Sequence, residues 1–368
     1  MLRKFTVSNF KNFKNKIVFD LGKPCNYEFN EEVVKNNCIT KGIIVGKNGS
    51  GKSNFAFALF DIILHLTDKE KILRKYNLYL NLNSKKNVAE FEYHFMFGGK
   101  ELVYKYAKRN FNTLVRESVF IGEEEVIQYD FTTNEGFTTL KGAETLNLVS
   151  NENNVSRVKY LISTAILDNT NENNIIFKEF AEYVNKMLMF FSLDQRGYQG
   201  FLSGSDSFTK GIIRAGKVED FQKFLSSQDI NYELVVQEIN GEKELFCVFD
   251  KTLIQFHEVI STGTRSLALF YYWYILMNKA SFVFIDEFDA FYHFELSKAI
   301  IELIKQLPNT QVFVSTHNTD LLSNDLLRPD CYFQIKDNKI NALNTLTLKD
   351  IRKAHNIQKM YKAGSFNE

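Results

Sequence analysis

Apolar and polar residues alternate near the start of the chain, and this period of two predicts short β-strands at residues 4–7 and 16–19. Residues 38–45, CITKGIIV, are mostly apolar without alternation, which is typical of a buried strand. After Ser53 the apolar residues recur every three or four positions, so a helix is expected there. Alternation returns over residues 88–130, where a pair of glycines separates two runs and predicts a hairpin.

The second half of the chain alternates between strand and helix patterns. Its expected elements are a loop-rich stretch over 131–175 with a helix at 155–167, mainly helices over 176–230, strands over 233–256, helices at 263–278, 295–306 and near 319–327, strands at 282–285 and 311–314, and a helix in the last 20 residues. This order of elements predicts an α/β fold.

A phosphate-binding motif connects the strand at 38–45 to the following helix. Residues 46–53 read GKNGSGKS and fit the pattern G-x-x-x-x-G-K-[ST] between a strand and a helix. Glycines let backbone N–H groups close around phosphate oxygens, and the following helix directs its positive end at the same anion. A glycine-rich turn without a ligand is the alternative, and the flanking strand and helix disfavour it. The expected nucleotide-binding residues are Gly46, Lys47, Asn48, Gly49, Ser50, Gly51, Lys52, Ser53 and Asn54.

Two carboxylates follow the strand predicted at 282–285, in the sequence FVFIDEFDA. In doubly wound sheets, ligands bind at the carboxyl ends of the strands. Asp286 is therefore expected to hold Mg²⁺ together with Ser53, and Glu287 is expected to act as the base that orients the attacking water. An ordinary acidic loop is the alternative for this pair alone.

A histidine follows the next predicted strand, in the sequence QVFVSTHN. A neutral imidazole at His317 could sense the γ-phosphate of ATP or hold the water. A lone solvated histidine would be the plainer interpretation. The order of strand, carboxylates, helix, strand and histidine favours the catalytic one.

Composition narrows the class of protein. The 368 residues carry a net charge of +1 and are 45% hydrophobic, which predicts a folded chain and argues against a generally basic nucleic-acid coat. The four cysteines form no metal-binding or disulfide pattern. No signal peptide and no run of 18 uncharged apolar residues is found, so we expect a cytoplasmic protein without a membrane span.

The phosphate loop, carboxylate pair and histidine, in this order, resemble the ABC-type ATPase heads of the SMC, RecF and OLD-like group. That group carries a signature loop that opens a helix before the carboxylate strand, and residues 261–266 here read STGTRS. The resemblance implies a signature at Ser261, Thr262, Gly263 and Thr264, which contacts the γ-phosphate held by another subunit. Thr262 replaces the usual glycine, and Arg265 stands where glutamine, glutamate or lysine is common.

Three further segments narrow the resemblance. Residues 9–13, NFKNF, look like the N-terminal segment of RecF and SMC heads. The segment AFYHFEL resembles the Leu-His-Pro segment of OLD-like ATPases, with His293 matching and Phe294 replacing the proline. The C-terminal sequence resembles the tails of AAA-type ATP-binding proteins from bacterial abortive-infection and phage-defence loci.

The implied fold is an α/β P-loop NTPase, an ABC-type ATPase head with a mixed sheet and an inserted helical lobe, using ATP and Mg²⁺. The expected parts are the N-terminal half of the head at 1–130, the inserted lobe at 131–230, and the C-terminal half at 231–368. ABC heads also carry a loop glutamine, but none occurs here between Ser53 and Ile127. His94 or another polar residue takes its place, or the coupling differs.

The distances between the motifs along the chain argue against two features found in members of this group, a coiled-coil rod and a fused nuclease. The 215 residues from Gly46 to Ser261 show no sustained heptads, so a coiled-coil rod is not expected. Only 51 residues follow His317, which argues against a fused nuclease. Cleavage of DNA or RNA would then require a separate chain.

One chain has one phosphate loop and one signature, so a homodimer around ATP, or a higher homo-oligomer, is expected. The leading hypothesis is an ATPase that regulates a separate nuclease or toxin in anti-phage defence. The alternative is a RecF-like repair ATPase that clamps DNA, for which the basic segments 73–76 (LRKY) and 105–109 (KYAKR) could contact phosphates. A scaffold with a degraded ATPase is disfavoured by the intact motif residues.

Overall fold

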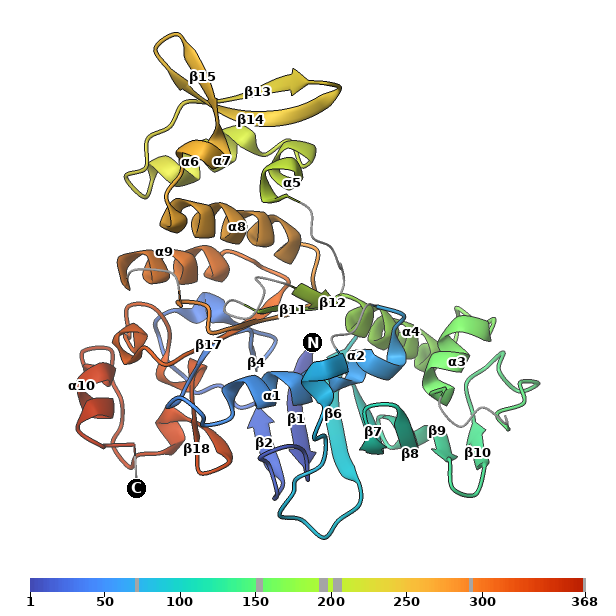
Figure 1. Ribbon diagram of the computed structural model, residues 1–368. Coiled ribbons are helices and arrows are strands. Elements are labelled where there is room, and N and C mark those ends of the chain that lie inside the picture. The colour runs from blue at the N-terminus through green and yellow to red at the C-terminus, as the bar shows by residue number, and fades with distance from the viewer. Residues whose placement is uncertain (70–72, 150–154, 192–197, 201–206, 291–293, 367–368) are drawn as a thin grey trace. The chain divides into compact units, whose positions relative to one another are not determined.

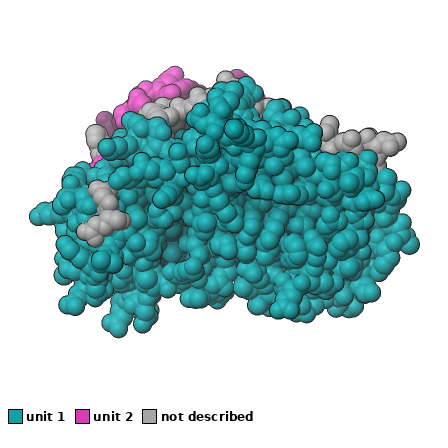
Figure 2. Space-filling model, turned by 90° about the horizontal axis from the view of Figure 1, so that it is seen from below, with its two compact units in different colours: residues 1–203, 281–288, 311–368 teal, residues 204–280, 289–310 magenta. Residues whose placement is uncertain are grey.

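The computed structural model describes residues 1–69, 73–149, 155–191, 198–200, 207–290 and 294–366. They form two compact units, coloured separately in Figure 2. Unit 1 comprises residues 1–203, 281–288 and 311–368, and unit 2 comprises residues 204–280 and 289–310. Both units contain helices as well as β-strands.

A mixed seven-stranded sheet forms the first layer of unit 1, with strand order β12-β11-β16-β17-β5-β18-β19. Figure 1 labels its strands β11, β12, β17 and β18. The five inner strands run parallel, and an antiparallel strand closes each edge. The inner strands β5, β11, β16 and β17 are buried along their whole length, as expected for a parallel sheet covered on both faces. The bounds are β5 Lys41–Val45, β11 Met187–Phe191, β12 Tyr198–Gly200, β16 Phe282–Asp286, β17 Gln311–Thr316, β18 Tyr332–Lys336 and β19 Lys339–Ala342.

An antiparallel seven-stranded sheet forms the second layer of unit 1, with order β10-β9-β8-β7-β6-β1-β2. Strand β6 alternates strictly between buried and half-buried residues, which explains the period of two in its sequence. The predicted glycine hairpin joins β6 to β7 and is confirmed. The bounds are β1 Leu2–Ser8, β2 Ile17–Asp20, β6 Ala89–Phe97, β7 Lys100–Asn110, β8 Thr113–Ile121, β9 Glu124–Asp130 and β10 Glu135–Thr138.

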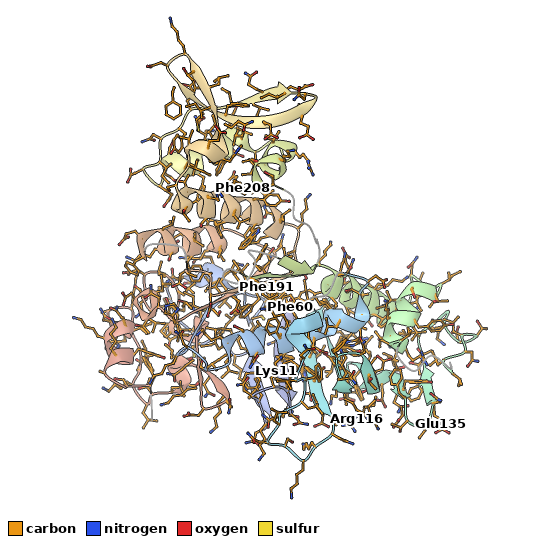
Figure 3. The ribbon with its side chains drawn as sticks, viewed as in Figure 1. Lys11, Phe60, Arg116, Glu135, Phe191 and Phe208 are labelled. Carbon is orange, nitrogen blue, oxygen red and sulfur yellow. The ribbon has the colours of Figure 1, made fainter. Side chains whose placement is uncertain are left out.

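Aromatic side chains fill the space between the helices and sheets of unit 1. Phe191 at the end of β11 stacks on Phe57 of α1 with ring centroids 5.8 Å apart, and Phe60 meets Phe282 edge to face (Figure 3 labels Phe191 and Phe60). The remaining elements are β3 Val34–Lys35, β4 Cys38–Ile39, α1 Lys52–Leu59, α2 Asp61–Leu66, α3 Arg157–Thr164, α4 Glu172–Asn185, α10 Ile357–Lys362 and the 3-10 helices η1 Glu31–Val33, η2 Leu73–Tyr76, η3 Thr319–Leu321, η4 Pro329–Cys331 and η5 Leu343–Thr345.

Unit 2 combines helices with a three-stranded antiparallel sheet of order β13-β14-β15. The sheet confirms the strands predicted over 233–256. Its elements are α5 Phe208–Arg214, α6 Val218–Ser226, β13 Leu234–Ile239, β14 Glu242–Phe249, β15 Thr252–Gln255, α7 Phe256–Val259, α8 Thr262–Met277 and α9 Phe294–Lys305.

Three element predictions are corrected. The mainly helical stretch predicted over 176–230 contains β11, because its short apolar sequence MLMFF has no period that separates a buried strand from a helix. The helix expected near 319–327 is only the short η3, and the C-terminal helix is only the six-residue α10. The three-part division of the chain into 1–130, 131–230 and 231–368 stays a prediction.

Candidate nucleotide-binding site

The loop between β5 and α1 has the shape that its glycines allow. Gly49 and Gly51 have φ values of 75° and 103°, in the left-handed backbone region that residues with a Cβ atom rarely adopt. A Cβ atom on Gly46 would lie 2.6 Å from Ser50 Oγ and 2.9 Å from the carbonyl oxygen of Ile335. The glycines of the motif are therefore required by backbone conformation and close approach.

Lys52 begins α1, and its ammonium group folds back into the loop. Its Nζ donates to the carbonyl oxygens of Gly46 at 2.9 Å and Lys47 at 3.3 Å, and the residue is 5% exposed. The buried Oγ of Ser50 has no hydrogen-bond partner among the described residues. A cradle with an ammonium group and an unsatisfied hydroxyl fits the phosphate groups of a nucleotide.

Asp286 and Glu287 are joined to the neighbouring strand by one buried serine. Ser315 Oγ donates to Asp286 Oδ1 at 2.5 Å and accepts from the backbone N–H of Glu287 at 2.9 Å. Glu287 has φ of 48°, a strained conformation for this residue type that clusters at functional sites. The sequence predictions missed Ser315, although it lies within the QVFVSTHN segment.

Strand register brings the motifs to one edge of the parallel sheet. Val45 of β5 pairs with Thr316 of β17, and Ile285 of β16 pairs with Val314. The phosphate loop, the carboxylates and His317 thus leave the carboxyl ends of three adjacent strands, as expected for a ligand site in such a sheet. His317 is exposed to solvent at this edge.

Asn12 links the N-terminal segment to the phosphate loop. Its Oδ1 accepts from Asn54 Nδ2 at 2.7 Å, and its Nδ2 donates to Asn338 Oδ1 at 2.8 Å. The same amide lies 2.5 Å from the position that a Cβ atom on Gly51 would take. In the sequence the NFKNF segment stands out only by its resemblance, and the structure shows how it contacts the loop.

The comparison with protein families matches residues 43–323 to the family described as "AAA domain, putative AbiEii toxin, Type IV TA system". This range runs from β5 past His317 and covers most of the chain. The chain belongs to this AAA domain family. The predicted relationship to AAA-type proteins of abortive-infection systems is therefore confirmed, and the parallel sheet with its phosphate loop agrees with the predicted α/β P-loop fold class.

Several solved structures are similar to this AAA domain. They include an SMC head domain from Thermotoga maritima (TM-score 0.46, 14% identity, 92% of this chain and 97% of that chain) and an SMC head bound to the C-terminal winged-helix domain of ScpA (0.44, 14%, 94% and 99%). A third is an SMC head with an extended coiled coil bound to the C-terminal domain of ScpA, derived from Pyrococcus furiosus (0.44, 14%, 92% and 95%). The search of curated proteins found no match.

The signature segment opens helix α8 of the AAA domain, within unit 2. Ser261 caps this helix, since its Oγ accepts from the backbone N–H of Thr264 at 3.1 Å. A Cβ atom on Gly263 would meet only Ser261 Oγ within 4 Å, at 3.7 Å, among the described residues. The geometry agrees with an open helix N-terminus, and the role of Ser261, Thr262, Gly263 and Thr264 stays a prediction.

Two other histidines from the sequence analysis have no demonstrated place in the site. His293 lies outside the described residues. His94 lies in β6, where its Nε2 is 2.6 Å from Glu92 Oε1 and its Nδ1 is 3.1 Å from Glu101 Oε1.

The described residues hold no cluster of three or more histidine, cysteine, aspartate or glutamate side chains arranged for a metal ion. The residues predicted to hold Mg²⁺ are Ser53 and Asp286, and magnesium sites of this kind usually use one or two protein oxygens together with the phosphates of a nucleotide. Among the helices of the described chain, none is both long and apolar enough to cross a membrane.

Proposed function

We propose that this chain is an ATP-binding and ATP-hydrolysing switch that dimerises around ATP and regulates a separate effector, a nuclease or toxin, in bacterial anti-phage defence. One observation carries the ATPase part of this proposal. The phosphate loop, the Asp286–Glu287 pair and His317 leave adjacent strands at one edge of a single sheet, with Ser315 joining two of the strands.

The proposed roles follow from the side chains at this edge. Lys52 turns from the loop carbonyls toward the β- and γ-phosphates, and loop N–H groups bind the same oxygens. Ser53 and Asp286 hold Mg²⁺, which neutralises phosphate charge when it is bound. Glu287 orients the attacking water, and His317 contacts the γ-phosphate or that water. The strained backbone of Glu287 supports a functional position for its side chain.

Dimerisation is proposed because each chain supplies one phosphate loop and one signature helix. In the ATP-bound dimer, the N-terminus of α8 from each chain contacts the γ-phosphate held by its partner. ATP then stabilises the closed dimer, and hydrolysis removes the contact that favours it.

The role in defence is supported by the family description, which names an AbiEii toxin and a type IV toxin–antitoxin system. The abortive-infection resemblance of the C-terminal segment points to the same class. The RecF-like alternative loses one basic side chain of its 105–109 segment, whereas Lys105 and Arg109 of the same segment are exposed. Lys108 in the KYAKR segment is fully buried and forms an ion pair with Asp61, with 2.6 Å between Nζ and Oδ1, so it cannot contact DNA phosphates in this fold.

The ATPase and dimer proposals are tested with Glu287→Gln. Loss of the base should leave ATP binding intact and slow hydrolysis by about 10²–10⁴-fold. The closed dimer should then accumulate, seen as an ATP-dependent doubling of mass by light scattering. Lys52→Ala combined with Glu287→Gln is the matched control and should stay monomeric because it binds no ATP. A Glu287→Gln chain that binds ATP and stays monomeric contradicts the dimer.

The effector proposal is tested separately by expressing the chain alone and together with the protein encoded beside it. We expect the neighbouring protein to co-purify, and the mass ratio to change when ATP is added. Toxicity of this chain alone, abolished by Lys52→Ala, would instead make the AAA domain itself the toxic component.

A further inference from the structure

A cavity of about 550 Å³ lies beside the phosphate loop, entirely within unit 1. Residues 47–50 of the phosphate loop form one wall of the cavity. The C-terminal segment that contains α10 forms the other wall. The carboxyl end of β18 forms its floor. Its volume falls within the range of small-molecule sites in proteins.

The strand order places this cavity at the end of the site opposite to the carboxylates. Asp286 ends β16, and the sheet continues through β17 and β5 to β18. A nucleotide whose γ-phosphate faces Asp286 has to extend from the loop in the other direction. Because the cavity lies over β18, it is on the path of the nucleoside end.

The lining has the chemistry of a nucleobase site. Tyr361 and Phe366 supply aromatic rings with centroids 6.2 Å apart. Gln334 is 7% exposed, and its Nε2 donates to the Tyr361 hydroxyl at 3.0 Å. Lys47 and Lys336 add positive charge to the lining, and Asp337 adds one carboxylate. An aromatic wall with one buried amide suits a flat heterocycle that offers hydrogen-bonding edges.

Helix α10 is tied to the segment that follows His317. Lys362 Nζ lies 3.0 Å from Asp320 Oδ1, and Gln358 donates to the same carboxylate. The hydrogen bond from Lys362 is the main cause of the lowered pKa of Asp320. These contacts fix α10, and with it Tyr361, independently of any ligand in the cavity.

We propose that this cavity binds the base and ribose of the nucleoside triphosphate, with Tyr361 as the residue that stacks on the base. The inference rests on the proposed ATP site and adds the groups that would distinguish a nucleotide from free polyphosphate. The C-terminal segment then forms part of the nucleotide site.

Calorimetry with the full chain, Mg²⁺ and either ATP or inorganic tripolyphosphate tests this inference. Tyr361→Ala should weaken ATP binding about tenfold, the usual effect of removing a stacked ring, and leave tripolyphosphate binding unchanged. Tyr361→Phe keeps the ring and should retain ATP affinity within about twofold. Tyr361→Leu removes the ring but preserves apolar volume, and replaces the alanine variant if that chain fails to fold.

The outcomes separate this inference from the proposed function. Equal loss of ATP and tripolyphosphate affinity in Tyr361→Leu, or no loss of either, overturns the base site alone. Two ATP molecules bound per wild-type chain, one of which survives Lys52→Ala, would also overturn it, because the cavity would then be an independent site. A wild-type chain that binds neither ligand overturns the ATP site itself.

Discussion

Two buried aspartates in unit 1, Asp61 and Asp286, differ in the side chains that surround their carboxylates. Asp61 begins α2, directly after the helix that follows the phosphate loop, and is completely buried against the antiparallel sheet. Asp286 ends β16 at the open edge of the parallel sheet and is 8% exposed. Both are acidic residues at a terminus of their element, but their hydrogen-bond partners differ in number and charge.

Both carboxylate oxygens of Asp61 accept hydrogen bonds from side chains within the fold. Its Oδ1 accepts from Lys108 Nζ at 2.6 Å and Tyr106 OH at 3.0 Å, and its Oδ2 accepts from Tyr79 OH at 2.8 Å. Burial lowers the pKa of Lys108, and the charge of Asp61 opposes that shift. This carboxylate connects α2 to β7 and is a structural group.

Asp286 accepts a hydrogen bond from the hydroxyl of Ser315, and no ammonium or guanidinium group of the described chain forms an ion pair with it. A buried carboxylate without a cation partner carries an unbalanced negative charge, which a divalent cation can neutralise. The comparison indicates that the partners of a buried acid, more than its burial, distinguish the structural carboxylate of Asp61 from Asp286, the proposed ligand of Mg²⁺.

The largest expected effect is a difference in stability between two single variants, Asp61→Asn and Asp286→Asn. Asp61→Asn leaves the Lys108 charge buried without its counter-charge, so we expect the free energy of unfolding to fall by about 3–5 kcal/mol. Asp286→Asn keeps an acceptor for Ser315 and should change it by about 1 kcal/mol or less. Urea denaturation measures both. Similar losses at the two sites would remove the distinction.

Ser315→Ala tests the link between the two site strands. Loss of its hydroxyl removes hydrogen bonds to Asp286 and to the N–H of Glu287, each worth about 1 kcal/mol. We expect ATP hydrolysis to fall about tenfold or more while ATP affinity stays nearly constant, since the phosphate loop is untouched. Ser323→Ala, outside this edge, serves as the control. Unchanged hydrolysis would show that the carboxylates need no such support.

The pH dependence of Asp61→Asn sharpens the comparison further. Lys108 has a lowered pKa in the folded chain and its ordinary value of 10.5 in the unfolded chain, so the unfolded state binds more protons between these values. The contribution of Lys108 to stability therefore rises with pH between its folded and unfolded pKa values. Removing Asp61 lowers the folded pKa of Lys108 further, so this pH range becomes wider. The deficit of the variant relative to the wild-type chain should therefore shrink as the pH rises from 7 to 10. A constant deficit contradicts the buried-charge explanation.

Asn12→Ala should have the smallest effect. The variant loses the hydrogen bonds from Asn54 and to Asn338, which costs about 1 kcal/mol at a partly exposed position. ATP affinity should fall a few-fold, and amide exchange in residues 46–54 should become faster. Asn338→Gly keeps the contact with Asn54, suits the left-handed backbone of residue 338 (φ 57°) and is the matched control. If both variants lowered ATP affinity equally, the hydrogen bond between Asn12 and Asn338 would account for the effect.

Much of the fold followed from local patterns. The buried strands 282–285 and 311–314 and the helices 263–278 and 295–306 agree with β16, β17, α8 and α9 to within one or two residues. Long helices with clear ends and short apolar runs next to turn residues are the cases in which local sequence is sufficient. Strand β11 could not be predicted this way, because five consecutive apolar residues suit a strand and a helix equally.

The sequence by itself determined which chemical groups stand at the proposed nucleotide site: the glycines and Lys52 of the loop, the Asp286–Glu287 pair and His317. These are local patterns, and each depends on residue type at fixed spacing. Only the tertiary structure decided that Lys108 is buried against Asp61, that Ser315 joins the carboxylates to the next strand, and that Asn12 and Tyr361 lie beside the phosphate loop. Such contacts join residues tens to hundreds of positions apart, and strand order and register bring them together without leaving a pattern in the local sequence.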